Sequence, residues 1–509
     1  MFLPFREFLP ACAVVVLLLG CGQAPQTVST PLRTSGIEQA NFDPETRHQD
    51  DFYHSVNGHW LATTPIPDDK SNYGAFSQLA DEAELNLKAI LEEAATTQAA
   101  DVEQAQLAAF WMAYMDEAGI EQRGLRPLAA QLAAIDAAAT HDALAALMGQ
   151  LLWQGVDLPF APYVHIDGRQ SDRYVVYLQQ SGLGLPDRDY FLGDNPKFVA
   201  MRQHYRQFVA DYLTLAGLDE AERRATAIYA IEEQLAHAQM SRVDNRDAEK
   251  TYNARAPTEM IALLDGFSWQ AYADEAGLAK ADKLVVGQPA YLAAFGHAFT
   301  AIAVADWQDY LRLRLLISYA DYLPAALFQR YFAFYGTTLK GVQQPRERWK
   351  RAVSAADQQL GELLGKRYVE RHFSPAAKAR MVQMVDNLIA AFDQSIDDLA
   401  WMSPATKEKA RQKLAKFTPK IGYPDKWRDY RTLVVKADDA LGNYQRAAAW
   451  EYQRQLAKLG QPIDRSEWFM TPQTVNAYYS AEANEIVFPA AILQPPFFNL
   501  NADDAVNYG

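Results

Sequence analysis

Histidine, cysteine and carboxylate side chains are the groups that could build a metal or nucleophilic site, and the sequence offers few useful arrangements of them. None of the nine histidines stands in an H-E-x-x-H pattern, which would place two zinc ligands one helical turn apart. Glu233 and His237 are four residues apart and could share a cation, but an ordinary solvated pair explains the same spacing. The only cysteines are Cys12 and Cys21, so the rest of the chain has no thiolate ligand. Motif chemistry alone therefore indicates no metal site.

Motifs for nucleophilic catalysis and phosphate binding are also missing or incomplete. The chain has no G-x-S-x-G, the strand-to-helix turn that presents the serine of many hydrolases. Gly182-Leu-Gly184 begins like a dinucleotide-binding loop but lacks the third glycine, and Pro186 disfavours the required helix start. Gly361 and Gly365-Lys366 resemble a phosphate-binding loop, but the spacing is one residue short. These motifs assign no chemistry.

Composition and charge narrow the class of protein. Hydrophobic residues make up 49% and charged residues 22% of 509 residues, which is the composition of a folded chain with more than one domain. The net charge of −15 argues against a nucleic-acid-binding protein, because such proteins need a basic surface.

The N-terminus has the pattern of an export signal. An apolar run from Ala11 to Leu19 is too short to span a bilayer and fits the central region of a secretory signal peptide. The run ends in Leu18-Leu19-Gly20-Cys21, which resembles the bacterial lipobox. We expect residues 1–20 to be a lipoprotein signal peptide, Cys21 to carry the lipid, and residues 21–48 to be a flexible tether. An ordinary signal peptide with an incidental cysteine is the alternative. Lipidation at Cys21 would anchor the protein facing the periplasm, and Gly22 favours the outer membrane.

The elements that must position any site are mainly helical. Apolar spacing predicts helices over residues 79–93, 104–118 with Gly119 as a C-cap, 140–151 with Thr140 as an N-cap, 198–212 and 404–413. β-like runs at residues 163–167 and 173–180 flank Asp167-Gly168 and predict an inserted hairpin. Two further strands are expected near the end, at residues 474–479 and 485–488. With only each other as partners, we expect them to expose apolar side chains, to be trimmed by proteases back towards residues 425–470, and to self-associate.

Five segments in order resemble the neprilysin-like family of zinc metallopeptidases, the neprilysin and endothelin-converting enzyme type. The strings that carry the resemblance begin with Asp51 to Trp60 and Tyr73 to Phe76. They continue through Gly182 to Tyr190 and through Arg348-Trp349 with Leu399 to Lys413. The last is Val475 to Phe498, which is followed by Asn507-Tyr508-Gly509. The resemblance extends from about residue 48 to the end and identifies the chain as a bacterial lipoprotein member of this family.

The resemblance implies a mainly α-helical fold. A large multi-helix N-terminal lobe, residues 49–425, would limit which peptides enter an enclosed chamber. A connecting segment, 426–474, would lead to the first strands of a thermolysin-like α+β catalytic lobe, 475–509. Members of the family bind zinc through H-E-x-x-H and a later glutamate, and the glutamate inside the motif is the general base. The motif follows the Asn-Tyr-Gly string in the family and is not in these 509 residues. We therefore expect a truncated chain, without catalytic or metal-binding residues and inactive alone.

The site residues that the resemblance implies are Asn476 and Ala477, which match the family's substrate-binding strand. An extended peptide can add to the edge of such a strand through main-chain hydrogen bonds, and Asn476 can add side-chain contacts. Some mammalian members bind a peptide's terminal carboxylate through arginines aligned with residues 72–80; this chain has none there. The expected activity is zinc-dependent endopeptidase hydrolysis of small peptides. The alternatives are a non-catalytic peptide-binding or scaffold lipoprotein, and an incomplete gene product without a function of its own.

Overall fold

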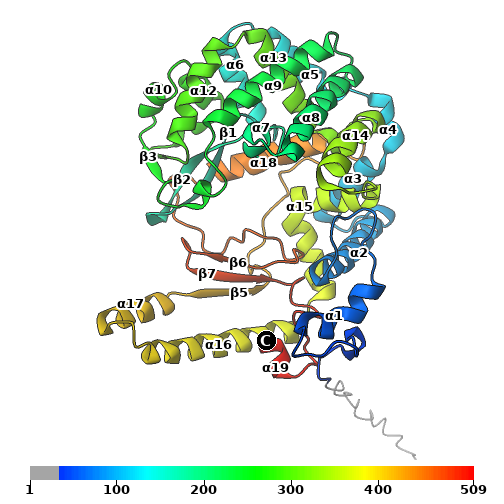
Figure 1. Ribbon diagram of the computed structural model, residues 1–509, viewed down its shortest axis with the longest axis vertical. Coiled ribbons are helices and arrows are strands. Elements are labelled where there is room, and N and C mark those ends of the chain that lie inside the picture. The colour runs from blue at the N-terminus through cyan, green and yellow to red at the C-terminus, as the bar shows by residue number, and fades with distance from the viewer. Residues whose placement is uncertain (1–33) are drawn as a thin grey trace, which may run out of the picture.

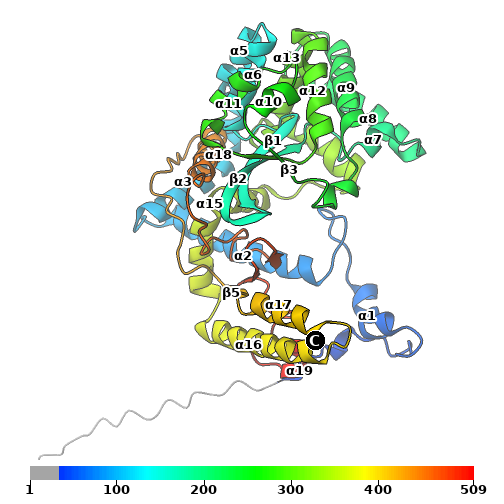
Figure 2. The same cartoon turned by 90° about the vertical axis from the view of Figure 1, so that its left-hand side faces the viewer.

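The computed structural model describes residues 34–509 and has two parts (Figure 1). The upper, larger part is a multi-helix body around a four-stranded sheet. The lower part holds a three-stranded sheet above two long helices. Figure 2, turned by 90°, shows the same division. The predicted export signal, with Cys12 and Cys21, lies outside the described residues. None of the helices among residues 34–509 combines the length and the hydropathy that crossing a membrane would need.

Most helices belong to the upper part (Figure 1). They are α3 (Val102–Met115), α4 (Glu117–Arg123), α5 (Ala129–Ala137), α6 (His141–Leu152), α7 (Asp189–Leu192), α8 (Pro196–Leu215), α9 (Ala221–Ala238), α10 (Glu259–Leu263), α11 (Trp269–Glu275), α12 (Pro289–Ala301), α13 (Val304–Ser318), α14 (Ala325–Phe332) and α18 (Ala440–Leu456). Short 3-10 helices lie at Gln39–Asn41, Arg126–Leu128, Asp244–Arg246, Leu278–Lys280 and Ala320–Tyr322, and a π-helix at Ala333–Thr338. The core of the upper part is aromatic, with fully buried Trp307, Tyr310 and Phe208.

The remaining helices lie in the lower part or between the two parts. The lower part contains α1 (Phe52–Thr63), α16 (Pro375–Asp398), α17 (Pro404–Leu414) and α19 (Asp504–Tyr508), while α2 (Ala75–Thr96) and α15 (Arg348–His372) lie between the parts (Figures 1 and 2). Ser374 and Ser403 cap α16 and α17 through their hydroxyls, and a proline follows each in the first turn. α15 has a kink where Leu360 leaves helical geometry.

The predicted hairpin is confirmed but belongs to a larger sheet. β1 (Phe160–Asp167) pairs antiparallel with β2 (Gln170–Gln180). β4 (Leu284–Val286) then pairs parallel with β2, and β3 (Asn253–Arg255) antiparallel with β4. The two added strands are only three residues each, too short for a periodic signal in the sequence.

The predicted helices form, with one correction between α3 and α4. The sequence indicated one helix from residue 104 to 118 with Gly119 as its C-cap. The chain instead ends α3 at Asp116 and starts α4 there, with Gly119 inside α4. The cause is Asp116, whose carboxylate accepts a hydrogen bond from the Gly119 N–H at 2.9 Å and so caps the new helix.

The C-terminal strands correct a second expectation. β6 (Tyr478–Ser480) and β7 (Glu485–Pro489) are not an isolated hairpin, because β7 also pairs parallel with β5 (Thr418–Gly422) over five residue pairs. The order is β5-β7-β6. Most of the apolar side chains expected to be exposed are buried instead, among them Val487, Ile492, Leu493 and Phe498. The segment is packed within this chain, which removes the reason given for trimming and self-association.

Candidate peptide-binding site

The edge of the lower sheet is the place where this chain can accept a peptide. β7 is the middle strand, and within the described residues the sheet ends at β6. The pairs Tyr478–Val487, Tyr479–Ile486 and Ser480–Glu485 use one side of β6. The other side of an edge strand presents main-chain N–H and C=O groups that another strand can pair with.

Asn476 and Ala477 lie directly before β6 rather than within it, so the predicted strand starts four residues too early at this site. The Asn476 amide oxygen accepts a hydrogen bond from the Ala477 N–H at 2.8 Å, and the Asn476 N–H donates to the Thr474 carbonyl at 3.0 Å. These local bonds form a turn and keep both residues out of the ladder. The Asn476 side chain is exposed, and its Nδ2 donates to no group of residues 34–509. The predicted secondary structure at Asn476 and Ala477 is therefore wrong, and their role in substrate binding stays a prediction.

The two tyrosines of β6 fix the strand from its two faces. The Tyr478 hydroxyl accepts a hydrogen bond from the Phe469 N–H at 3.0 Å, and burial raises the pKa of this phenol. The Tyr479 ring stacks on Phe417 with centroids 6.3 Å apart, and its hydroxyl donates to Asn484 at 3.2 Å. Successive strand residues point to opposite faces, so β6 is held from both sides while its outer edge stays available.

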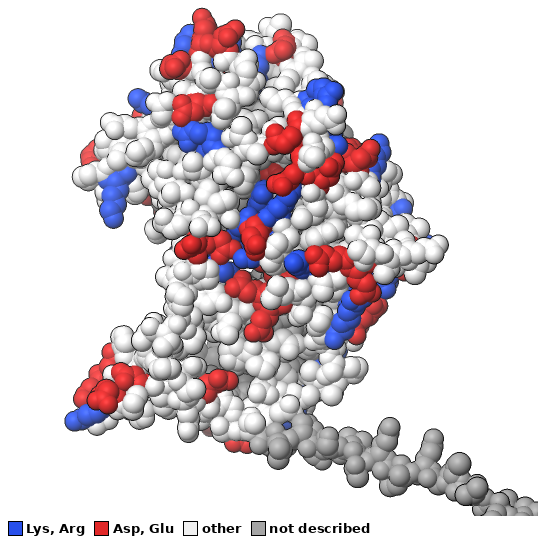
Figure 3. Space-filling view, turned by 90° about the vertical axis from the view of Figure 1, so that its right-hand side faces the viewer, with Lys and Arg blue, Asp and Glu red and all other residues white. Residues whose placement is uncertain are grey.

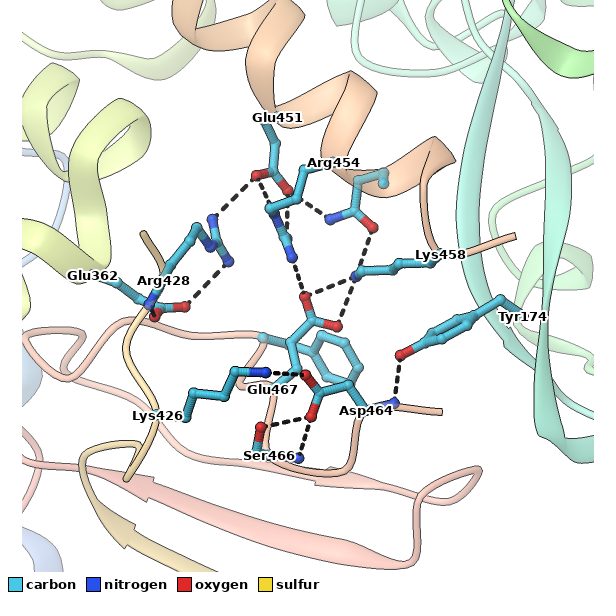
Figure 4. Close-up of polar contacts among 12 residues, drawn as sticks. Tyr174, Glu362, Lys426, Arg428, Glu451, Arg454, Lys458, Asp464, Ser466 and Glu467 are labelled. Carbon is cyan, nitrogen blue, oxygen red and sulfur yellow. Dashed lines mark hydrogen bonds and ion pairs between the residues drawn. The ribbon is translucent and has the colours of Figure 1, made fainter. Parts of the chain in front are cut away.

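A chain of charged contacts joins the sheet to the upper part (Figure 4). Glu467 lies in the loop before β6. Its carboxylate pairs with Arg454 of α18 at 2.8 Å and with Lys458, in the turn after α18, at 2.7 Å. The Glu467 carbonyl accepts from Lys420 of β5 at 2.8 Å, and Lys420 pairs with Glu485 of β7 at 2.7 Å. Burial alone would raise the pKa of Glu467, but Lys458 and Arg454 hold it below its ordinary value. The loop that leads to β6 is therefore fixed at Glu467 both to the upper part and to the sheet.

The same network continues to α15. Arg428 lies 3.2 Å from Glu362 of α15 and 3.2 Å from Glu451 of α18 (Figure 4). Arg454 also pairs with Glu451 at 2.8 Å. Acids and bases alternate along the chain of contacts, so these partly buried charges compensate one another.

A second contact fixes the residues that lead into Asn476. The Asp357 carboxylate on α15 accepts from the Thr471 hydroxyl at 3.1 Å and from the Gln473 amide, which also donates to the Gly361 carbonyl at 2.8 Å. Burial raises the pKa of Asp357 to about 6. A Cβ on Gly361 would lie 2.5 Å from the Thr471 methyl carbon, so glycine permits this close contact. Sequence reasoning missed Asp357; the helical glycines at 361 and 365 were the available signal.

The described residues do not provide a zinc site. No three His, Cys, Asp or Glu side chains among residues 34–509 lie together in a way that could hold a metal ion. Glu233 instead accepts a hydrogen bond from the Tyr229 hydroxyl at 3.2 Å. The donor set that zinc needs does not fit any cluster in this part of the chain.

Comparisons with known proteins place these features in a family. Residues 48–424 match the N-terminal-domain model of peptidase family M13, and residues 476–509 match the peptidase-domain model. Human neprilysin is 27% identical over 516 residues, covering 92% of this chain and 67% of that protein. Mouse endothelin-converting enzyme-like 1 is 28% identical over 500 residues, covering 94% of this chain. This chain spans 64% of that relative's length.

Solved structures agree with the sequence matches. The zinc metalloprotease ZMP1 of Mycobacterium tuberculosis, in complex with an inhibitor, superposes with a TM-score of 0.89 at 42% identity, covering 94% of this chain and 73% of that one. PepO from Lactobacillus rhamnosis gives a TM-score of 0.83 at 28% identity, covering 91% and 74% of the two chains. The chain belongs to peptidase family M13, the neprilysin-like zinc metallopeptidases.

Proposed function

We propose that this chain binds extended peptides along the outer edge of β6 and is the substrate-binding part of a zinc-dependent endopeptidase. The observation that carries the proposal is the edge strand β6, which begins directly after Asn476 and Ala477. Both residues fall at the start of the segment that matches the M13 peptidase-domain model. A peptide that adds to this edge would be bound through its backbone, which accepts many sequences.

Residues of this chain would position the bound peptide. Asn476 can donate its Nδ2 to a peptide carbonyl next to the β6 edge, because that donor has no partner within the described chain. The anchored Glu467 loop and the Asp357 contact hold the entry to β6 in place before the peptide arrives. A pre-formed edge loses less conformational entropy on binding than a mobile strand would.

We propose that hydrolysis needs zinc ligands beyond those in residues 34–509. Zinc would supply Lewis-acid chemistry to activate water, but no H-E-x-x-H is present in the 509 residues. The expected behaviour of the purified 509-residue chain is peptide binding without cleavage. Chelator-sensitive cleavage by this chain would contradict that part of the proposal.

The test is peptide binding by the wild-type chain and by Asn476→Ala. Losing one hydrogen bond of about 1 kcal/mol should weaken binding of an extended acetylated peptide about fivefold. Asn387→Ala is the matched control, because Asn387 lies on α16 and donates only to the Tyr508 hydroxyl. If no extended peptide bound to the wild type, or if both variants lost affinity equally, the edge would not be the site.

The second candidate is a non-catalytic peptide-binding or scaffold lipoprotein. It uses the same edge and is supported by residues 18–21, which resemble a lipobox. Both candidates share the proposed location on the periplasmic side of the membrane, with the outer membrane favoured. Changing Cys21→Ser should move the protein from the membrane fraction to the soluble fraction. Wild type that is already soluble and carries no lipid by mass spectrometry would refute the anchor.

A further inference from the structure

A second feature lies at the far end of the same strand. A cavity of about 600 Å³ opens where the β6–β7 turn, the end of α17, the loop before β6 and the tip of the β1–β2 hairpin meet. Figure 1 shows the hairpin tip above the sheet end nearest α17. The charged side chains that line the cavity are mainly basic: they are Lys413, Lys416 and Arg465, with one carboxylate, Glu482.

The three cations of this cavity have no carboxylate partner within the described chain. Lys413 Nζ lies 5.9 Å from the centre of the Tyr479 ring, and Arg465 donates to the Ala483 carbonyl at 3.0 Å. Lys416 makes no side-chain hydrogen bond or ion pair among residues 34–509. Glu482 accepts only from the Ser480 hydroxyl, at 3.3 Å, and pairs with none of the cations.

Helix stabilisation does not account for the cluster. A lysine in the last turn of a helix interacts favourably with the helix dipole, and Lys413 is in the last turn of α17. Arg465 comes from a separate loop, and Lys416 follows the end of the helix. The chain carries a net charge of −15, so three uncompensated cations around one cavity make a local positive potential on an acidic protein.

The cavity lies in the path of a peptide on β6. Its residues Ala481–Asn484 follow immediately after Ser480, the last residue of the strand. Ser480 is four positions after Asn476, and an extended chain rises about 3.3 Å per residue, so the cavity starts at most about 13 Å from Asn476. A peptide residue about four or five positions from the one at Asn476 would reach it.

We propose that this cavity binds an Asp or Glu side chain of the peptide on β6, so that the chain prefers peptides with an acidic residue at that spacing. The inference rests on the proposed function and names a substrate class for it. Charge complementarity selects the occupant, because three cations and one carboxylate line the cavity, so a carboxylate is attracted there and a basic side chain is repelled. A neutral side chain would leave the cations hydrated and gain nothing there.

The experiment is calorimetric titration of the full chain with capped decapeptides that share a neutral β-branched core. One Glu is moved through the positions, and each peptide is compared with its Gln counterpart. We expect one or two adjacent positions at which Glu binds about fivefold more tightly than Gln at low salt. The gain should disappear at about 0.5 M NaCl, where exposed charges are screened.

Two double variants separate the cavity from general charge effects. Lys413→Gln with Lys416→Gln should remove the gain for Glu and leave Gln peptides unaffected. Lys407→Gln with Lys409→Gln removes the same number of positive charges from the chain but does not touch the cavity, and it should keep the gain. Circular dichroism checks that both variants are folded.

The outcomes distinguish this inference from the proposed function. Equal loss of the gain in both double variants, or equal affinity for Glu and Gln at every position, would overturn the cavity assignment. If Asn476→Ala still weakens binding of the neutral peptide in that case, the β6 edge remains the peptide site. If no peptide binds at all, the proposed function fails and the inference fails with it.

Discussion

The upper helical part and the lower sheet differ in what holds them together. The upper part is built mainly from helices whose apolar stripes meet in an aromatic-rich core, and this core continues into the lower part. The lower sheet is built from strands that are far apart in the sequence, with β5 more than 60 residues before its partner β7. The face in Figure 3 carries acidic and basic side chains interspersed over both parts. The helices of the upper part are specified by local sequence pattern, whereas the lower sheet depends on pairing between strands that are distant in the sequence.

The largest expected effect breaks the packing of the lower sheet. Val487 is fully buried in the middle strand, between Lys420 of β5 and Tyr478 of β6. Val487→Asp should lower the free energy of unfolding of the lower part by about 4 kcal/mol, because it buries an unpaired charge. Limited proteolysis should then cut the C-terminal segment, which we expect to stay resistant as far as Phe498 in the wild type. Val434→Asp, at an exposed position, is the control.

A wild-type chain that is trimmed as readily as the Val487→Asp variant would reverse this picture. It would mean that the strands make no stable contact with β5, as the sequence alone suggested. The upper part and the lower sheet would then differ in stability as well as in the kind of interaction that specifies them.

The next effect concerns the charged contacts that join the two parts. Glu467 is about 10% exposed and pairs with both Arg454 and Lys458, so Glu467→Gln leaves two cations without their partner. We expect a loss of about 2 kcal/mol in chemical denaturation. Glu249→Gln removes an ion pair with Arg169 that is 84% exposed on the carboxylate side, and it should change stability by less than about 0.5 kcal/mol. Equal effects of the two substitutions would contradict the anchoring role of Glu467.

How much of this structure can be predicted from the sequence depends on how far apart in the chain the interacting residues lie. Thr140 and the stripe of α8 could be assigned because caps and helical spacing act within one or two turns. The site was located by resemblance to a family, on Asn476 and Ala477, and not by local chemistry. Neither Asp357 nor the pairing of β5 with β7 was predictable, because each depends on residues more than 60 positions away. The break at Asp116 was missed because one side chain redirected a backbone hydrogen bond.

A smaller effect tests the contact of α15 with the residues before β6 through its pH dependence. Burial raises the pKa of Asp357 to about 6, above its ordinary value of 3.8, so the folded chain holds this proton more tightly than the unfolded chain. The contribution is present in full below about pH 4 and is lost as the pH rises through about 6. Asp357→Asn cannot titrate, so the difference in stability between variant and wild type should change by about 1–2 kcal/mol over this range. A pH-independent difference would show that Asp357 is solvated.

The smallest expected effect concerns the N-cap of α6, a helix of the upper part. Thr140 was assigned as an N-cap from sequence, and its hydroxyl accepts the Ala143 N–H at 3.2 Å at the start of α6. Thr140→Ala should lower stability by about 1 kcal/mol, since it leaves one helix N–H without its cap, while Thr140→Ser should cost only a few tenths. Because α6 packs in the upper part, hydrogen exchange should speed up in its first turn and stay unchanged in β5, β6 and β7. Faster exchange in the sheet would mean that the two parts unfold as one cooperative unit, and the separation of local from long-range stabilisation would not describe this protein.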